Sequence, residues 1–285
     1  MKAFHRALLV CPTCHGDLRD ADSNALECAA CDTSYPQVND VPRFRSSGED
    51  AESERAYIEG VRGWLRRHPA LYEWVFRLLA PVLVTGPDAA KALEDVDPRG
   101  GVIDLGAGND RRHPEWMNVD LLPYPEVDVV ADATRLPFAD ERLAGVVCIV
   151  VLEHVPDPVA VLDEIHRVLG RGGRLFLAVP FLQPFHAAPH DYRRWTVPGL
   201  REELQSKGFH VRRAGVYCGP ASAVAWLLAE VLALVFSLGS ERWQARFRLP
   251  AQVLCSPLKW LDWGLTRLRG SENLASAIYA EAIRK

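Results

Sequence analysis

GVIDLGAGND, residues 101–110, joins a short apolar run to an aspartate and a glycine-rich turn. The runs MNVD, VDVVADA, AGVVCIVVLEHV and RLFLAVP follow it, and the helical pattern VAVLDEIHRVL precedes the last of them. Alternation of this kind is typical of a parallel α/β sheet. Acidic residues end the first four runs, at the strand ends where such sheets bind their ligands. These carboxylates are therefore candidates for a binding site.

The turn and the second acidic residue narrow the ligand class. A dinucleotide-binding GxGxxG pattern that starts at Gly106 needs glycine at 111, where this chain has Arg111. No Gly-Lys-Ser/Thr follows the turn, which excludes a P-loop. Asp120, 16 residues after Asp104, is placed to hold a ribose diol through paired hydrogen bonds.

An ordered set of motifs carries a family resemblance. DLGAGND, NVD, ADATRLPFAD, VLEHVPDP and RVLGRGG resemble the class I S-adenosylmethionine-dependent methyltransferases, from about Val102 to Phe209. GFHVRR and SAIYAEAIRK would be the sixth and seventh strands. The resemblance implies a Rossmann-like seven-stranded sheet with helices on both faces, and S-adenosylmethionine as cofactor.

The same resemblance implies roles for single residues. It places Asp104, Gly106 and Gly108 under the methionine part, Asp120 at the ribose hydroxyls, Leu121 on the adenine, Asp132 and Ala133 at the adenine edge, and Glu153 and His154 along the pocket. Three positions depart from the family pattern: Asp110 replaces a glycine, NDRRHPEW replaces a helix, and Ala144 replaces an aspartate. We expect the first two to reshape the methionine end of the pocket.

The amino-terminal segment contains CxxC twice, with thirteen residues between the pairs: Cys11, Cys14, Cys28 and Cys31. Two such turns complete a closed, structural four-cysteine zinc site. Seven cysteines and a short first apolar run favour a reducing compartment, the cytoplasm. With SYPQVNDVP, the segment resembles the zinc ribbon of the tRNA-methyltransferase activator family. That resemblance implies a module that binds a protein partner or stabilises the chain.

FLQPFHAAPHDYRRWT, residues 181–196, follows the predicted fifth strand. A hydroxyl nucleophile needs a base, and histidine suits that role near neutral pH. The loop resembles that of methyltransferases from bacterial polysaccharide and sugar pathways. This implies that His186 is a base or substrate contact, and that Asp191, Tyr192 and Arg194 shape or clamp the acceptor.

Two alternatives for this loop stay open. His186, His190 and Asp191 would be a two-histidine, one-carboxylate metal site. A structural turn would instead pair Asp191 with Arg194. In either case Thr196 is the predicted N-cap of the next helix.

Residues 221–239 carry one charge, Glu230, and are as long as a membrane span. Residues 240–270 carry six basic and two acidic residues, interleaved with tryptophans. Strand seven must return beside strand six, so a single crossing is excluded. The pattern predicts an interfacial hairpin on a bilayer, or else a buried helix or a dimer interface.

These observations predict a zinc ribbon over 1–46, a helical connector over 47–98 and a methyltransferase domain over 99–285, with 220–270 as an insertion. The predicted reaction is O-methylation of a sugar, glycan or lipid-linked acceptor in the cytoplasm, with peripheral contact to the inner face of the membrane. Two alternatives are an rRNA or tRNA methyltransferase and a non-catalytic scaffold. The net charge of −4 and the absence of an Asn-Pro-Pro-Tyr motif argue against nucleic acid.

Overall fold

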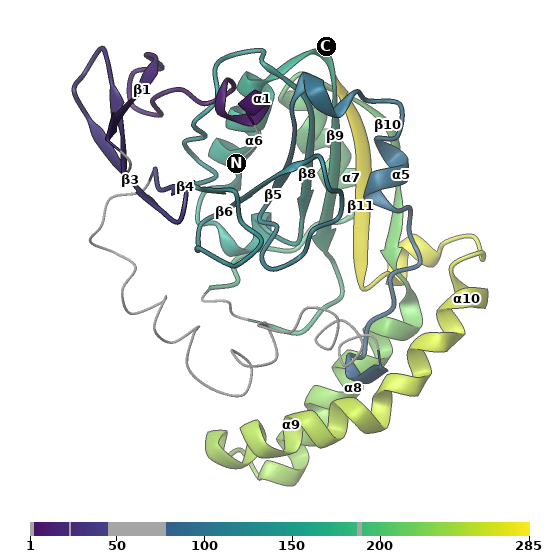
Figure 1. The fold of residues 1–285 in the computed structure, drawn as a ribbon. Helices are drawn as coiled ribbons and strands as arrows, with labels where there is room; N and C mark the ends of the chain where they lie inside the picture. Colours follow the sequence, from purple (N-terminus) through teal and green to yellow (C-terminus); the bar gives the residue numbers. More distant parts are fainter. Residues whose placement is uncertain (1–2, 23, 45–77, 187–189) are drawn as a thin grey trace.

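The computed structural model describes residues 3–22, 24–44, 78–186 and 190–285. A four-stranded sheet stands beside a seven-stranded sheet, and a helical arm extends from one edge of the larger sheet (Figure 1). Most of the connector predicted over 47–98 lies outside the described residues. Its described part contains the short helix α5 (Ala89–Ala92), which Asp88 caps.

The four-cysteine segment folds as two copies of one turn on a small antiparallel sheet. The helix α1 (Ala3–Arg6) precedes the strands β1 (Leu18–Asp22), β2 (Ala25–Cys28), β3 (Ser34–Val38) and β4 (Val41–Pro42), which pair in that order. The amides of Cys11 and Cys28 each donate to the carbonyl five residues on, in Gly16 and Thr33. This repeated turn is the local geometry that the CxxC spacing predicts.

The larger sheet has the strand order β10-β11-β9-β8-β5-β6-β7. Its strands are β5 (Val102–Leu105), β6 (Met117–Asp120), β7 (Val129–Val130), β8 (Leu143–Ile149), β9 (Leu169–Pro180), β10 (Phe209–Cys218) and β11 (Ala277–Arg284). β11 is antiparallel to both of its neighbours, and the other pairs are parallel. The predicted fold class is therefore confirmed, with strand seven beside strand six.

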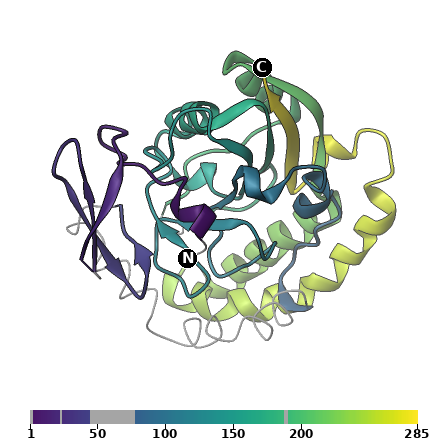
Figure 2. The ribbon, with the colours of Figure 1, turned by 45° about the horizontal axis from the view of Figure 1, so that its top comes forward.

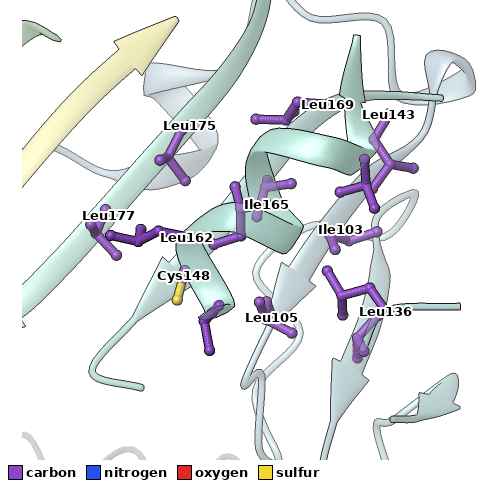
Figure 3. Close-up of a cluster of buried hydrophobic side chains, with 14 of the residues drawn as sticks. Ile103, Leu105, Leu136, Leu143, Cys148, Leu162, Ile165, Leu169, Leu175 and Leu177 are labelled. Carbon is purple, nitrogen blue, oxygen red and sulfur yellow. The ribbon is translucent and has the colours of Figure 1, made fainter. Parts of the chain in front are cut away.

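Helices cover both faces of this sheet because its strands are apolar on both sides. On one face, α6 (Pro158–Val168) buries Leu162 and Ile165 against Ile103, Cys148 and Leu177 (Figure 3). The helix α7 (Val197–Ser206) packs on the same face, and Thr196 caps it as predicted. The other face packs against α5.

The ribbon docks on the β7 edge of the larger sheet. The amide of Phe44 donates to the carbonyl of Val130 at 2.8 Å, and that of Val10 donates to Pro137 at 3.0 Å. Buried ribbon residues such as Leu26 belong to the same hydrophobic cluster as the sheet. An exposed edge strand offers unpaired backbone groups to other chains, so the ribbon protects this edge.

The strand β8 ends earlier than the sequence indicates. It stops at Ile149, and Leu152–His154 forms a 3₁₀ turn, η2. Val150, between them, has a φ of 56°. A β-branched residue rarely adopts this left-handed conformation, so the backbone is strained directly after the end of β8.

The insertion forms a helical arm that begins and ends at one point of the sheet. It contains α8 (Pro220–Ser237), α9 (Glu241–Cys255), η3 (Ser256–Leu261), α10 (Asp262–Leu265) and η4 (Ser271–Leu274). Cys218 and Ala277, which flank it, are paired across β10 and β11. Because β10 is parallel to β9, the arm leaves from the carboxyl edge of the parallel strands (Figures 1 and 2).

Candidate functional site

The glycine turn after β5 leaves a free space at that edge. Gly106 and Gly108 have φ values of 72° and 59°. A Cβ on Gly106 would lie 2.2 Å from Val151 Cγ2, whereas one on Gly108 would meet nothing within 4 Å. The turn therefore needs glycine for its conformation and for packing, and it opens beside Gly108.

Asp120, at the end of β6, ties this turn to the next one. Its carboxylate accepts hydrogen bonds from the amides of Gly108 at 2.8 Å and Leu122 at 2.9 Å. Burial raises the pKa of Asp120, and the backbone donors oppose that shift. Leu121 is 40% exposed beside it. A carboxylate and an apolar side chain therefore stand together at the turn, as predicted.

Asp132 stands further along the same edge. One of its oxygens accepts from both the amide and the hydroxyl of Thr134, each at 2.8 Å. The Asp132 side chain thus stabilises the turn that runs from Asp132 to Thr134. The partly buried Ala133 packs against the core.

Two arginines that the sequence analysis did not assign hold the segment between β5 and β6. Arg112 Nη1 lies 2.6 Å from a carboxylate oxygen of the fully buried Asp104. Burial raises the pKa of Asp104 to about 6, and the guanidinium opposes that shift. Arg111 pairs with Glu126 at 2.8 Å and Asp128 at 3.1 Å. These ion pairs replace the helix that the family pattern places here.

Glu153, in η2, lies between His154 and His186 in a second group of polar side chains. It is fully buried, and neither carboxylate oxygen has a hydrogen-bond partner among the described residues. The Nε2 atoms of His154 and His186 each lie 3.8 Å from Glu153 Oε1. An unpartnered buried carboxylate is costly, so the site favours a cation or a shared proton at this point.

The Nδ1 atoms of His154 and His186 are hydrogen-bonded to backbone carbonyls. His154 Nδ1 bonds to the carbonyl of His190, and His186 Nδ1 bonds to that of Pro184 at 3.0 Å. A carbonyl only accepts, so each Nδ1 carries the hydrogen and each neutral ring presents an unprotonated Nε2. The ligand-type atoms of Glu153, His154 and His186 lie within 4.8 Å of one another.

The loop after β9 holds His186 in place through Asp191. The carboxylate of Asp191 accepts from the His186 amide at 2.9 Å and forms a bidentate ion pair with Arg194. That guanidinium lowers the pKa of Asp191 to about 2. The structure thus contains the Asp191–Arg194 turn that the sequence left as an alternative.

The metal set predicted from His186, His190 and Asp191 is not brought together. Arg194 and the His186 amide occupy the Asp191 carboxylate. His190 contributes its backbone carbonyl rather than its ring, while Glu153 and His154 take the places beside His186.

The helical arm contributes a residue that the sequence analysis missed. The ring of Trp226, on α8, lies 5.3 Å from the ring of His186. The amide of Tyr192 donates to the carbonyl of Glu153 at 2.7 Å, which joins the loop to η2. These contacts bring η2, the loop after β9 and the first turns of α8 together at the candidate site.

The four cysteines of the ribbon fit zinc. Their sulfurs lie within 4.8 Å of one another, with Cys11–Cys31 at 3.7 Å and Cys14–Cys28 at 3.4 Å. A zinc tetrahedron with bonds of about 2.3 Å has edges of roughly 3.8 Å. The chain therefore binds structural zinc through these four thiolates, as predicted.

Comparison with known proteins gives two family matches. Residues 95–177 match the methyltransferase domain, and residues 4–39 match the Trm112p-like protein family. A ubiquinone biosynthesis O-methyltransferase of Xylella fastidiosa (strain M23) is 32% identical over 181 residues, which cover 56% of this chain and 68% of that protein. The chain belongs to the S-adenosylmethionine-dependent methyltransferases. This methyltransferase thus combines the predicted ribbon and catalytic fold in one chain.

Two further matches are a sequence relative that shares a shorter stretch and a solved structure. A demethylmenaquinone methyltransferase of Mycobacterium sp. (strain KMS) is 37% identical over 81 residues, which cover 27% of this chain and 35% of that protein. Phosphoethanolamine N-methyltransferase 2 of Haemonchus contortus, solved with S-adenosyl-L-methionine, is 15% identical with a TM-score of 0.46. The match covers 85% of this chain and 61% of that one.

Proposed function

We propose that this methyltransferase O-methylates a hydroxyl group of a lipid-linked acceptor. The observation that carries the proposal is the buried Glu153 carboxylate at the carboxyl edge, whose Oε1 lies 3.8 Å from the Nε2 atoms of both His154 and His186. A hydroxyl nucleophile must lose a proton, and this group can receive one. The named quinone-biosynthesis relatives support a lipid-borne acceptor and give no support to a sugar or glycan.

Several features support the cofactor roles that the family pattern assigns. The free space beside Gly108 admits a ligand, Asp120 has acceptor oxygens for ribose hydroxyls, and Leu121 offers an exposed apolar surface for adenine. Asp104, Gly106, Asp132 and Ala133 complete the proposed set. When bound, S-adenosylmethionine supplies an electrophilic methyl group on a sulfonium.

His186 is the proposed proton acceptor. When bound S-adenosylmethionine supplies the methyl group to the acceptor oxygen, His186 Nε2 would receive the proton that the hydroxyl group loses. Glu153 then stabilises the imidazolium, because its charge lies 3.8 Å away in a buried site. The proposed role of Asp191 and Arg194 is to position His186 through the contacts of the loop.

We propose the cytoplasm as the location and a small molecule as the acceptor. A nucleic-acid substrate has less support, because the chain is net negative. The ribbon is proposed to stabilise its own catalytic domain, since it already pairs with the β7 edge.

Calorimetric titration with S-adenosylmethionine, followed by a methyl-transfer assay on short-chain hydroquinones and on sugars, tests the proposal. Wild type should bind the cofactor, and Asp120→Ala should bind it weakly. Transfer to the hydroquinone should fall by about 10²–10⁴ in His186→Gln with cofactor affinity retained. Cofactor binding with transfer only to sugars would contradict the lipid-linked acceptor, and failure to bind would favour a scaffold.

A further inference from the structure

We infer that the helical arm between β10 and β11 docks on the surface of an anionic lipid bilayer. The role that we give to this docking, which is to bring a lipid-linked acceptor to the site, rests on the proposed function. The evidence for the docking is independent of that function: the two faces of α8, the charges around them, and the way the arm joins the sheet.

The helix α8 has one face of small residues and one of large apolar residues. Ala225, Ala229 and Ala233 are fully buried and recur every fourth residue, where they pack against Ala251 and Cys255 of α9. The exposed large residues also recur at helical spacing: Val224, Leu227, Leu228, Val231, Leu234 and Val235. This continuous apolar stripe faces outward although the helix already has a packed partner.

The tip of the arm extends the stripe and adds aromatic and basic groups. Leu238 is 94% exposed, Phe236 and Trp243 lie beside it in sequence, and Arg246 lies over the Trp243 ring at 5.1 Å. At the other end, the exposed rings of Trp260 and Trp263 are 5.1 Å apart. Tryptophan and arginine around an apolar surface are typical of a helix at a membrane interface.

The exposed, unpaired charge of the arm's described residues is net positive. Glu230 is paired with Arg248 at 2.9 Å, and the buried Asp262 accepts from the amides that begin α8. Four exposed arginines, Arg242, Arg246, Arg267 and Arg269, stand against two exposed glutamates, Glu241 and Glu272. Each basic residue near an anionic surface strengthens binding, so an anionic bilayer is the matching partner.

The connection to the sheet indicates that the arm lies on the bilayer. Among the described residues α8 is the helix long and apolar enough to span a membrane. Cys218 and Ala277, at the two ends of the arm, are paired in the sheet, so both ends are on one side. An apolar hollow of about 370 Å³, lined by Val224, Leu258, Leu261 and Leu268 with Arg269, is suited to an acyl chain.

The stripe is connected to the candidate active site through α8 itself. Trp226, between the exposed residues Val224 and Leu227, contacts the ring of His186. A bilayer against this helix would therefore lie close to the pocket. An acceptor anchored by its lipid would need to leave the membrane by only a short distance.

Sedimentation of the zinc-loaded full chain with vesicles tests the inference. We expect binding to phosphatidylcholine vesicles that contain phosphatidylglycerol, weaker binding to phosphatidylcholine alone, and loss of binding as salt is raised. The double variant Val231→Gln/Leu234→Gln should lose binding. Arg242→Gln/Arg246→Gln should lower the partition coefficient for the anionic vesicles by about tenfold or more.

Val38→Gln is the matched control, because Val38 is an exposed valine on the ribbon, and it should bind vesicles like wild type. Circular dichroism and S-adenosylmethionine binding, both unchanged in the arm variants, would exclude a folding defect and separate this test from that of the proposed function. No sedimentation with either vesicle would overturn the inference. So would a wild-type dimer that the Val231→Gln/Leu234→Gln variant dissociates, because the stripe would then face a second copy of the chain.

Discussion

Among the described residues there are two clusters of ligand-type side chains, which are built in opposite ways. The four cysteines come from two local turns within 21 residues, Cys11 to Cys31. Glu153 and His154 come from the 3₁₀ turn η2, whereas His186 comes from the loop that follows β9. The first cluster stabilises a segment too small to fold alone, and the second contains a buried carboxylate with no hydrogen-bond partner among the described residues. The local spacing of the cysteines therefore specifies the zinc site, whereas the tertiary fold brings Glu153, His154 and His186 together.

Zinc removal should give the largest effect on stability. Structural zinc contributes roughly 10 kcal/mol or more of apparent binding free energy, and the ribbon core is continuous with that of the sheet. Chelation, or Cys28→Ser, should lower the midpoint of thermal unfolding for the whole chain, as measured by calorimetry.

Cys255→Ala is the control for the zinc experiment, because Cys255 lies in the arm, away from the four-cysteine site. It should retain zinc and ribbon structure. If chelation instead unfolded the ribbon and left the midpoint of the catalytic domain unchanged, the ribbon would not stabilise its neighbour.

The second cluster should show the opposite response, a loss of activity without a loss of stability. Glu153→Gln removes the charge proposed to stabilise the imidazolium, so kcat should fall by about 10²-fold or more. The midpoint of unfolding should change little, because losing the ion pairs of Glu153 with His154 and His186 is offset by removing a buried carboxylate that has no hydrogen-bond partner among the described residues. Kinetics and calorimetry on the same preparation measure both.

The exposed His210 offers a histidine control on β10. His210→Gln should leave kcat unchanged. A variant at Glu153 that lost stability and kept its activity would reverse the comparison between the two clusters.

The pH profile should report the state of His186. Its pKa is raised: burial lowers it, but the neighbouring Glu153 and Asp191 and the Pro184 carbonyl outweigh that effect. Only the neutral ring accepts a proton, so kcat/KM should rise as the pH passes upward through this raised pKa. Glu153→Gln should move the inflection to lower pH, and an unmoved inflection would mean that another group titrates.

The smallest effect concerns Asp191, whose pKa falls to about 2 from the ordinary 3.8 because of Arg194. A lowered carboxyl pKa stabilises the fold above pH 4, by about 2 kcal/mol, and this contribution is lost as the pH falls toward 2. Asp191→Asn should therefore be less stable than wild type at pH 7, and the difference should shrink at pH 3. Urea unfolding at the two pH values measures it, and a constant difference would contradict the ion-pair explanation.

Much of the catalytic fold could be predicted because its signals are local. The apolar runs, the glycine turn and the Thr196 cap each lie within a few residues, and the structure has them where the sequence indicates. The end of β8 could not be placed, because Val150 adopts a left-handed conformation that its residue type disfavours. The ion pairs of Arg111 and Arg112 were also missed, since Glu126 and Asp128 lie just before β7 and Asp104 lies in β5.

The sequence by itself determined the zinc ligands, the order of the strands along the chain and the carboxylates at the strand ends. Periodicity and short spacing encode these features directly. Only the tertiary structure decided which of these groups meet. It placed His186 against Glu153 and Trp226, joined Asp191 to Arg194, and set the ribbon on the β7 edge. These contacts depend on chain crossings and loop geometry, which a periodic pattern does not contain.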